Sequence, residues 1–189
     1  MNDSNRLLSL RSDVRLTPLS SERAESMYRW MQDASVRENV GLRTEPSLER
    51  TLAWIAAAEN NSAMRAYAIV ADGQHVGNVV LDKLDSYLKS ARLSMYIGEK
   101  TSRGKGLGVT AAYMAAAKGF GELSLNKLWL TVHVHNYSAM NVYSKLGFTV
   151  EGIHREEFIL EGRPVSVFYM GLLKKEFQDM PVQWVSEDA

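Results

Sequence analysis

Hydrophobic positions recur with two different periods along the chain, and each period predicts its own kind of element. In the first sixty residues the spacing is three to four, the period of a helix that buries one face. It predicts one helix that Ser20 or Ser21 caps and a second that Ser47 caps. A short strand over residues 14–16 is predicted before them. The segment 35–46 shows no period and is predicted to be a loop.

From residue 66 onward most segments alternate with period two, which predicts half-buried strands joined by turns. The strands are predicted at 66–71, 76–81, 91–97, 128–134, 148–157 and 164–173, and two further helices at 107–120 and 138–146. Asp72-Gly73 is a strong hairpin signal, and Gly147 is placed to end a helix in the left-handed conformation. The predicted order is β-α-α-β-β-β-α-β-α-β-β. It describes a mixed α/β (α+β) fold around one main sheet.

Composition restricts the class of protein further. The chain has 189 residues, with 22 basic and 22 acidic side chains and therefore no net charge. Such a balance offers no broad positive field to a phosphate backbone, so we expect no nucleic-acid partner. No stretch approaches the roughly 18 apolar residues that cross a bilayer, and the N-terminus lacks a secretory pattern, so we expect no membrane partner.

The absence of cysteine excludes disulfides and thiol nucleophiles and fits a reducing compartment, so we expect a cytoplasmic protein. No linker or repeat divides the chain. We therefore expect one domain over 1–189, with a core of about 12–177 and terminal extensions at 1–11 and 178–189.

The segment from Tyr96 to Gly108 carries the first chemical signal. Its three glycines at alternate positions, Gly104, Gly106 and Gly108, follow a predicted strand and open a predicted helix. Backbone N–H groups can converge there, and a helix N-terminus adds roughly half a positive charge, an arrangement that binds phosphate or pyrophosphate. The spacing fits neither a P-loop nor a dinucleotide fingerprint. A glycine-rich turn that binds nothing is the alternative.

A second segment lies about 30 residues downstream. The pattern Arg103-x-x-Gly106-x-Gly108, followed by Asn136-x-x-Ala139-x-x-x-Tyr143-x-x-Leu146-Gly147-Phe148, resembles the GNAT superfamily of acetyl-CoA-dependent N-acetyltransferases. The Ile97-Gly98-Glu99-Lys100 lead-in and the spacing of Trp30, Val36-Arg37 and Trp54 resemble the subgroup of ribosomal-protein, polyamine and nucleotide-amino-sugar acetyltransferases.

The resemblance implies a fold and a set of residue roles. The fold is a mostly antiparallel sheet of about seven strands, splayed between its fourth and fifth strands and flanked by about four helices. The cofactor is acetyl-CoA, and no metal is implied. The cofactor-binding residues would be Met95, Tyr96 and Ile97 on a strand edge, Arg103, Gly104, Lys105, Gly106, Leu107 and Gly108 at the pyrophosphate, and Asn136 at the pantetheine arm. Tyr143 would be the general acid that protonates the departing thiolate.

The remaining polar and aromatic candidates have ordinary structural interpretations beside functional ones. His133 and His135 share a strand face, but no third ligand makes a metal site, and either of them or His154 could relay a proton. His75 is expected to be exposed. Further candidates are Trp30 and Trp54 as packing residues, the acidic cluster Glu156, Glu157 and Glu161, and Arg37 and Arg43, which could favour an anionic acceptor. No residue is assigned as the general base, because the strand 92–96 holds no acid.

These features predict an enzyme that moves an acetyl group by direct attack to the primary amine of a small molecule. A nucleotide-linked amino sugar is the preferred acceptor, and a polyamine or the N-terminus of a peptide is the alternative. A non-catalytic CoA-binding regulatory module is the alternative from another class. A homodimer formed through the C-terminal tail around Trp184 is a further expectation.

Overall fold

A computed structural model describes residues 7–42, 44–160, 162–178 and 180–186 of the chain. Seven strands form the main sheet in the order β2-β3-β4-β5-β6-β8-β7. Their bounds are β2 Val14–Pro18, β3 Arg65–Ala71, β4 Gln74–Asp85, β5 Ser90–Ile97, β6 Lys127–His133, β7 Thr149–Leu160 and β8 Arg163–Leu173. Every neighbouring pair is antiparallel except β5 and β6, which run parallel. The mixed, mostly antiparallel seven-stranded sheet predicted above is confirmed.

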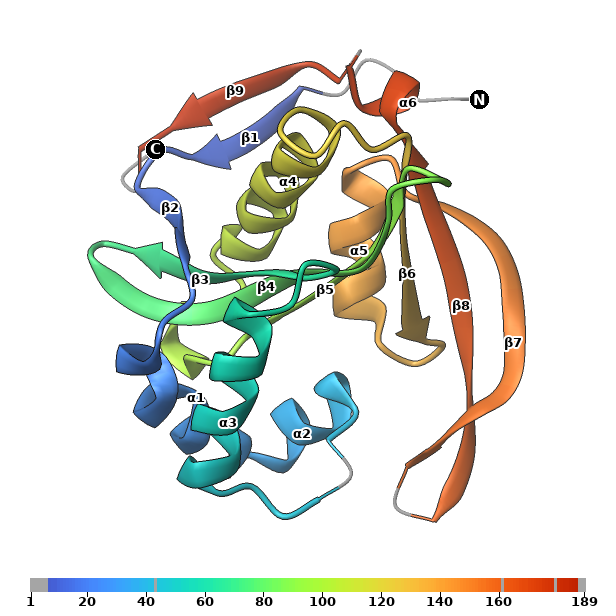
Figure 1. Cartoon of the computed structure of the whole chain (residues 1–189). Helices are drawn as coiled ribbons and strands as arrows, with labels where there is room; N and C mark the ends of the chain where they lie inside the picture. The colour runs from blue at the N-terminus through green and yellow to red at the C-terminus, as the bar shows by residue number, and fades with distance from the viewer. Residues whose placement is uncertain (1–6, 43, 161, 179, 187–189) are drawn as a thin grey trace.

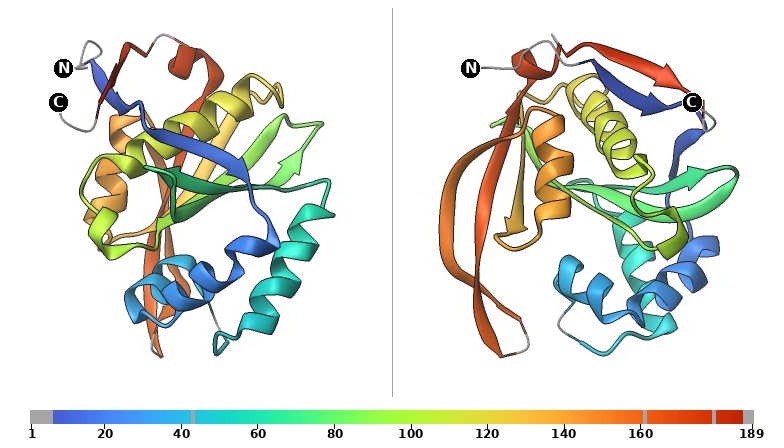
Figure 2. Two further views of the ribbon diagram at one scale, coloured as in Figure 1. Left: turned by 90° about the vertical axis from the view of Figure 1, so that its left-hand side faces the viewer. Right: turned by 180° about the vertical axis from the view of Figure 1, so that it is seen from behind.

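Helices cover both faces of this sheet (Figure 1, Figure 2). Their bounds are α1 Ala24–Met31, α2 Ala34–Val40, α3 Leu48–Glu59, α4 Leu107–Phe120, α5 Tyr137–Lys145 and α6 Lys174–Gln178, with 3-10 turns η1 Ser21–Arg23 and η2 Lys100–Ser102. The α4 and α5 helices lie on one face, and α1, α2 and α3 lie on the other, under β3, β4 and β5.

Two apolar clusters hold these layers together. The larger one packs α4 and α5 on the sheet, with Leu81, Leu93 and Leu128 almost completely buried. The smaller one packs α1 and α3 on the opposite face and contains Trp30 and Ile55. A cavity lies beside the smaller cluster, on the same face of the sheet.

The prediction of a loop over 35–46 is wrong, because α2 occupies its first half. The Asp33 side chain caps α2 by accepting a hydrogen bond from the Ser35 N–H, and Gly41 ends it at φ +67°. A helix this short shows too few apolar positions for its period to be seen, and Val36 is its buried anchor. The local sequence signals for α2 were its capping residue, Asp33, and the glycine that ends it, Gly41.

The two ends of the chain form a separate parallel pair. β1 (Leu8–Arg11) pairs with β9 (Val182–Val185), and the two strands lie over α4. The ring of Trp184 meets that of Tyr113 edge to face at 6.3 Å, so the tail packs on its own chain. The segments predicted as terminal extensions thus contain two strands. Each has only four residues, too few for an alternation of apolar and polar positions to predict it.

Among the residues that the structure describes, no helix is both long and apolar enough to span a membrane.

Candidate functional site

The main sheet opens into a slot between β5 and β6. Only Ser90, Ala91 and Arg92 of β5 pair with β6, although β5 continues to Ile97 and β6 to His133. Because the Gly98 N–H bonds to the Val76 carbonyl, the alternation of the ladder turns the N–H groups of Met95 and Ile97 away from β4, toward the slot. The splay that the family resemblance implied is therefore present, and its wall offers unpaired backbone groups.

The glycine loop stands at the open end of this slot, between η2 and α4. Gly104 and Gly106 adopt φ of +78° and +77°, which a side chain disfavours, and a Cβ at either would meet no other atom within 4 Å. Gly108 differs, because it is helical and its Cβ would lie 3.2 Å from Met95 Cε. Two glycines thus shape an open backbone cradle at the N-terminus of α4, and the third permits close packing. Leu107, between them, is buried.

The two basic side chains of the loop are used differently. Arg103 donates from Nε to the Ile97 carbonyl at 3.0 Å and from Nη2 to the Gly98 carbonyl at 3.2 Å. Its Nη2 also lies 3.6 Å from Asp33. Lys105 is exposed, and no described residue pairs with it. Arg103 therefore braces the end of β5, and Lys105 is the cation that remains available to an anion.

Asn136 and Tyr143 face the slot from the other side. Asn136 caps α5, its Oδ1 accepting from the Ala139 N–H at 3.1 Å. Tyr143 is 6% exposed, and its ring packs edge to face on Phe148. Burial raises the pKa of the Tyr143 phenol well above its usual range. The hydroxyl therefore stays protonated at neutral pH, as a proton donor must.

A cavity of about 560 Å³ joins the slot to the space beneath α1–α3. Its walls come from α1, α3, the segment after α2 and the end of β7, including Met27, Met31, Trp54 and Phe158. Asn136 and Tyr143 line its slot side. Trp30 belongs to the packed core as predicted, whereas Trp54 is a wall residue that is 39% exposed.

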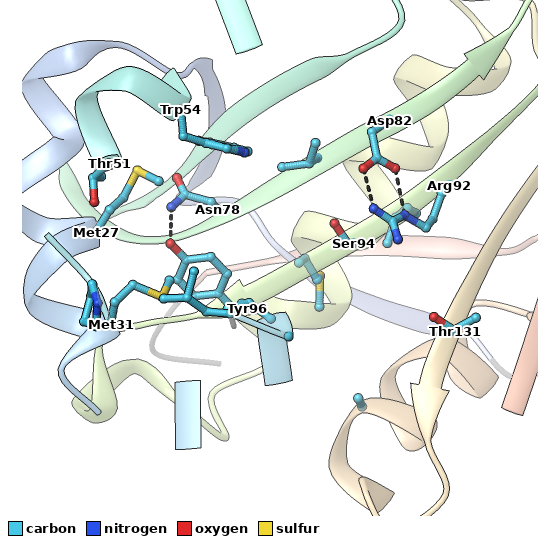
Figure 3. A pocket seen from close by; sticks show the side chains of 18 of the residues that line it. Met27, Met31, Thr51, Trp54, Asn78, Asp82, Arg92, Ser94, Tyr96 and Thr131 are labelled. Atoms are coloured by element: carbon cyan, nitrogen blue, oxygen red, sulfur yellow. Dashed lines mark hydrogen bonds and ion pairs between the residues drawn. The ribbon is translucent and has the colours of Figure 1, made fainter. Parts of the chain in front are cut away.

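Three cross-strand pairs form the floor of the cavity. Figure 3 shows two of them from close by, Asn78 with Tyr96 and Asp82 with Arg92. Along β4 and β5 these opposed pairs are Asn78 with Tyr96, Val80 with Ser94, and Asp82 with Arg92. All six side chains line the cavity, because alternate residues of a strand share a face. The floor therefore runs from an uncharged polar pair, over a pair of one apolar and one small polar side chain, to an ion pair.

The uncharged end of the floor is held by a chain of hydrogen bonds. Asn78 donates from Nδ2 to the Tyr96 hydroxyl at 2.7 Å, and His75 Nε2 donates to Asn78 Oδ1 at 3.0 Å. His75 packs against Trp30, with ring centroids 4.6 Å apart, and burial lowers its pKa. The expectation that His75 is exposed is therefore wrong, because the strand carries it past the hairpin and under α1. The side chain of Tyr96, predicted only as a strand-edge contact, lies on the floor.

The charged end was not foreseen. Arg92 donates from Nε to Asp82 Oδ1 at 2.8 Å and from Nη2 to Asp82 Oδ2 at 2.6 Å, with the Asp82 side chain 13% exposed and that of Arg92 32% exposed. The strand 92–96 holds no acid of its own, and Asp82 on the neighbouring strand β4 is the carboxylate that lies beside it. Asp82 and Arg92 lie at nearly equal distances along the chain from the turn that joins β4 and β5, and this spacing could have predicted that they face each other.

The other sequence candidates are distributed around this cavity. Of the four histidines only His133 lines it, and burial lowers the pKa of that imidazole. His135 lies 5.4 Å from His133 between ring centroids, and His154 stacks on Tyr169 outside the cavity. No group of three metal-ligating side chains occurs among the described residues.

Charged candidates of the loops do not gather at the cavity. Arg37 donates from Nη1 to the carbonyls of Met31 and Gln32, so it caps the end of α1 and is not a lining residue. Glu156 and Glu157 are exposed on β7. Arg43 and Glu161 lie outside the described residues.

A splayed sheet with a glycine cradle at a helix N-terminus and a buried tyrosine across the slot defines a site that can hold an anionic group beside an open strand edge. A family model described as "Acetyltransferase (GNAT) domain" matches residues 13–149. The chain therefore belongs to the GNAT acetyltransferase family.

The individual relatives that match this chain have low sequence identity to it. Spermidine N(1)-acetyltransferase of Escherichia coli K12 is 31% identical over 118 residues, 62% of this chain and 63% of the relative. The putative ribosomal N-acetyltransferase YdaF of Bacillus subtilis is 26% identical, over 66% of this chain and 79% of that one. The match thus spans less than two thirds of the length of the spermidine acetyltransferase.

Among solved structures, spermidine N-acetyltransferase from Vibrio cholerae in complex with CoA and spermine superposes with a TM-score of 0.84. The superposition covers 89% of this chain and 99% of that one at 23% sequence identity. At 23% sequence identity this structural likeness is evidence for the fold alone.

Proposed function

We propose that this protein transfers the acetyl group of acetyl-CoA to the primary amine of a small molecule. The observation that carries the proposal is the position of Tyr143, which is buried and lines the same cavity as Met95 and Tyr96 of β5. The glycine cradle at Gly104 and Gly106 supports a pyrophosphate at the mouth of the same slot. The geometry fits a CoA molecule whose arm lies between β5 and β6.

In the proposed reaction the amine nitrogen attacks the thioester carbonyl carbon directly. The oxyanion that forms accepts a hydrogen bond from a slot-facing N–H of β5, at Met95 or Ile97. The carbon–sulfur bond then breaks, and Tyr143 gives its proton to the thiolate. The nitrogen loses one proton, and the uncharged His133 is the histidine of the cavity able to accept it. When the products leave, solvent takes this proton from His133 and returns one to the Tyr143 phenolate. No covalent enzyme intermediate is needed.

The acceptor enters from the cavity beneath α1 and α3. The relatives named as spermidine acetyltransferases place polyamines among the acceptors to be tested. The argument for a nucleotide-linked amino sugar loses one of its two arginines, because Arg37 caps α1. The walls formed by Met27, Met31 and Trp54 suit an amine on an apolar arm.

The test is release of free CoA thiol from acetyl-CoA with three groups of acceptors: polyamines, nucleotide amino sugars and peptides with free N-termini. Tyr143→Phe is measured in parallel. Because general acid catalysis contributes about 10²–10⁴-fold, turnover of the variant should fall by about that factor while acetyl-CoA binding persists. Tyr113→Phe is the matched control, since Tyr113 packs against Phe177 in the core and does not line the cavity.

Equal turnover of wild type and Tyr143→Phe at every pH would remove Tyr143 from the mechanism. Acetyl-CoA that raises the melting temperature without turnover of any acceptor would favour the non-catalytic CoA-binding module.

A further inference from the structure

The ion pair on the cavity floor leaves part of its arginine unused. The two hydrogen bonds between Asp82 and Arg92 engage Nε and Nη2 of the guanidinium and both oxygens of the carboxylate. The remaining nitrogen, Nη1, has no partner among the described residues, and Arg92 lines the cavity. The pair as a whole is neutral, and what it can still offer a ligand is chiefly N–H donors.

Among the described residues that line the cavity, the other charged side chains are those of Glu45 and Arg50, and both are exposed on the rim. Asp82 thus stands as the one acid of the floor, and a guanidinium covers it at hydrogen-bond distance. A ligand ammonium brought to this end would meet Arg92 as a like charge, whereas a ligand oxygen would meet unused N–H groups.

We propose that Arg92 determines the acceptor specificity of this enzyme by masking Asp82. The acceptor is then an amine whose apolar arm ends in an anionic or uncharged oxygen, and amines with a second ammonium are disfavoured. This inference rests on the proposed function, because it concerns the second substrate of the same site. The floor is long enough for such an acceptor, since four residues along a strand span roughly 13 Å from the Tyr96 rung to the Arg92 rung.

The experiment uses amines of one arm length and different far ends: 6-aminohexanoate, hexylamine and 1,6-diaminohexane. For the wild type we expect kcat/KM for 6-aminohexanoate to exceed that for 1,6-diaminohexane about tenfold. Arg92→Gln exposes Asp82 and should reverse this ratio, while Asp82→Asn frees Arg92 and should increase it. The shift should appear mainly in KM, because the far end contributes to binding rather than to chemistry.

Two further variants keep the test interpretable. Arg92→Gln leaves a partly buried carboxylate unpaired and could unfold the protein, so the double variant Asp82→Asn with Arg92→Gln removes both charges together. It should lose the discrimination between the two probes. Arg11→Gln is the matched control, because Arg11 and Asp13 form the same two-bond pair outside the cavity. Its probe ratio should equal that of the wild type.

The proposal is overturned if the wild type prefers 1,6-diaminohexane, or if Arg92→Gln keeps the wild-type ratio. It is also overturned if Glu45→Gln, rather than Arg92→Gln, changes the preference. Calorimetric titration of the same probes into the CoA-bound protein separates this inference from the proposed function. Tighter binding of 6-aminohexanoate without any turnover would support the masking role and contradict the acetyl transfer; equal or undetectable binding of both probes would overturn the masking role.

Discussion

The indole of Trp30 lies against the bare backbone of Gly98, where the last residues of β5 pass under α1. A Cβ built on Gly98 would stand 2.1 Å from Trp30 Cδ2 and 2.4 Å from Cε3. The indole is 4% exposed and packed in the smaller apolar cluster. This contact sets how closely α1 approaches the strand that leads into the glycine loop.

Gly98→Ala should therefore destabilise the protein by about 1–3 kcal/mol, the usual cost of overpacking a core. Denaturant unfolding would measure the change. Gly152→Ala is the control, because a Cβ at Gly152 meets nothing within 4 Å. A Gly98→Ala variant as stable as Gly152→Ala would show that the indole moves aside freely.

Gly106→Val should raise the Kd for acetyl-CoA at least tenfold, because a branched side chain would stand in the cradle and strain a backbone at φ +77°. Gly162→Val is the control that distinguishes a side chain blocking the cradle from backbone strain at positive φ. Gly162 has the same φ of +77° and equally open surroundings at the tip of the β7–β8 hairpin. Calorimetric titration should show normal affinity there. Weak binding by both variants would assign the effect to general strain.

Asp33→Asn should tighten acetyl-CoA binding about threefold at low salt, a modest gain of the size expected for exposed charges. Asp33 Oδ2 lies 3.3 Å from Lys100 Nζ and 3.6 Å from Arg103 Nη2, so the substitution removes a negative charge beside two cations of the loop and makes the local potential more positive for the incoming pyrophosphate. Titrations at low and high salt would measure this gain, which should disappear at high salt. Unchanged affinity at low salt would mean that neither cation reaches the cofactor.

His75 should make the stability of the protein fall in mild acid. Burial lowers the pKa of its imidazole in the folded state below the ordinary value of 6.5. The unfolded chain then binds the proton first, so stability is full above pH 6.5 and is lost as the pH falls toward the folded-state pKa. His75→Gln retains a donor for Asn78 and does not titrate.

The melting temperature of His75→Gln should therefore fall less than that of the wild type between pH 7.5 and pH 5.5. Burial also lowers the pKa of His133, which is present in both proteins, so the difference between them reports His75. Parallel curves would contradict a buried, neutral His75.

Truncation after Phe177 should lower stability by about 2–3 kcal/mol, because it removes β9 from β1 and the Trp184 ring from Tyr113. Trp184→Ala should cost less, about 1 kcal/mol, since that side chain is 50% exposed. Denaturant unfolding and light scattering would measure stability and solution mass. A change of mass on truncation would indicate that the tail joins two copies instead.

The parts of the fold that depend on local sequence could be predicted, and those that depend on packing could not. The α4 helix spans residues 107–120 as predicted, because its alanines and its opening glycine are local signals. Gly147 adopts φ +81° and ends α5 as expected. By contrast, α2 and the β1–β9 pair are short and rely on partners distant in sequence.

The candidate site divides in the same way. The glycine cradle follows from a motif that is continuous along the chain, and the slot was implied by the family resemblance. The cavity floor depends on the register between β4 and β5, which opposes Asp82 to Arg92, and on α1 covering His75. Neither relationship could be read from one strand alone.

The slot divides the main sheet into two parts, β2 to β5 and β6 to β8. Only three residue pairs, the last of them Arg92 with Trp129, connect β5 to β6. Asp82 and Arg92 lie on β4 and β5, beside these pairs, whereas Phe158, on β7, lines the cavity from the other side of the slot. The cavity is therefore bounded by both parts of the sheet, while its charged end is built by one part alone.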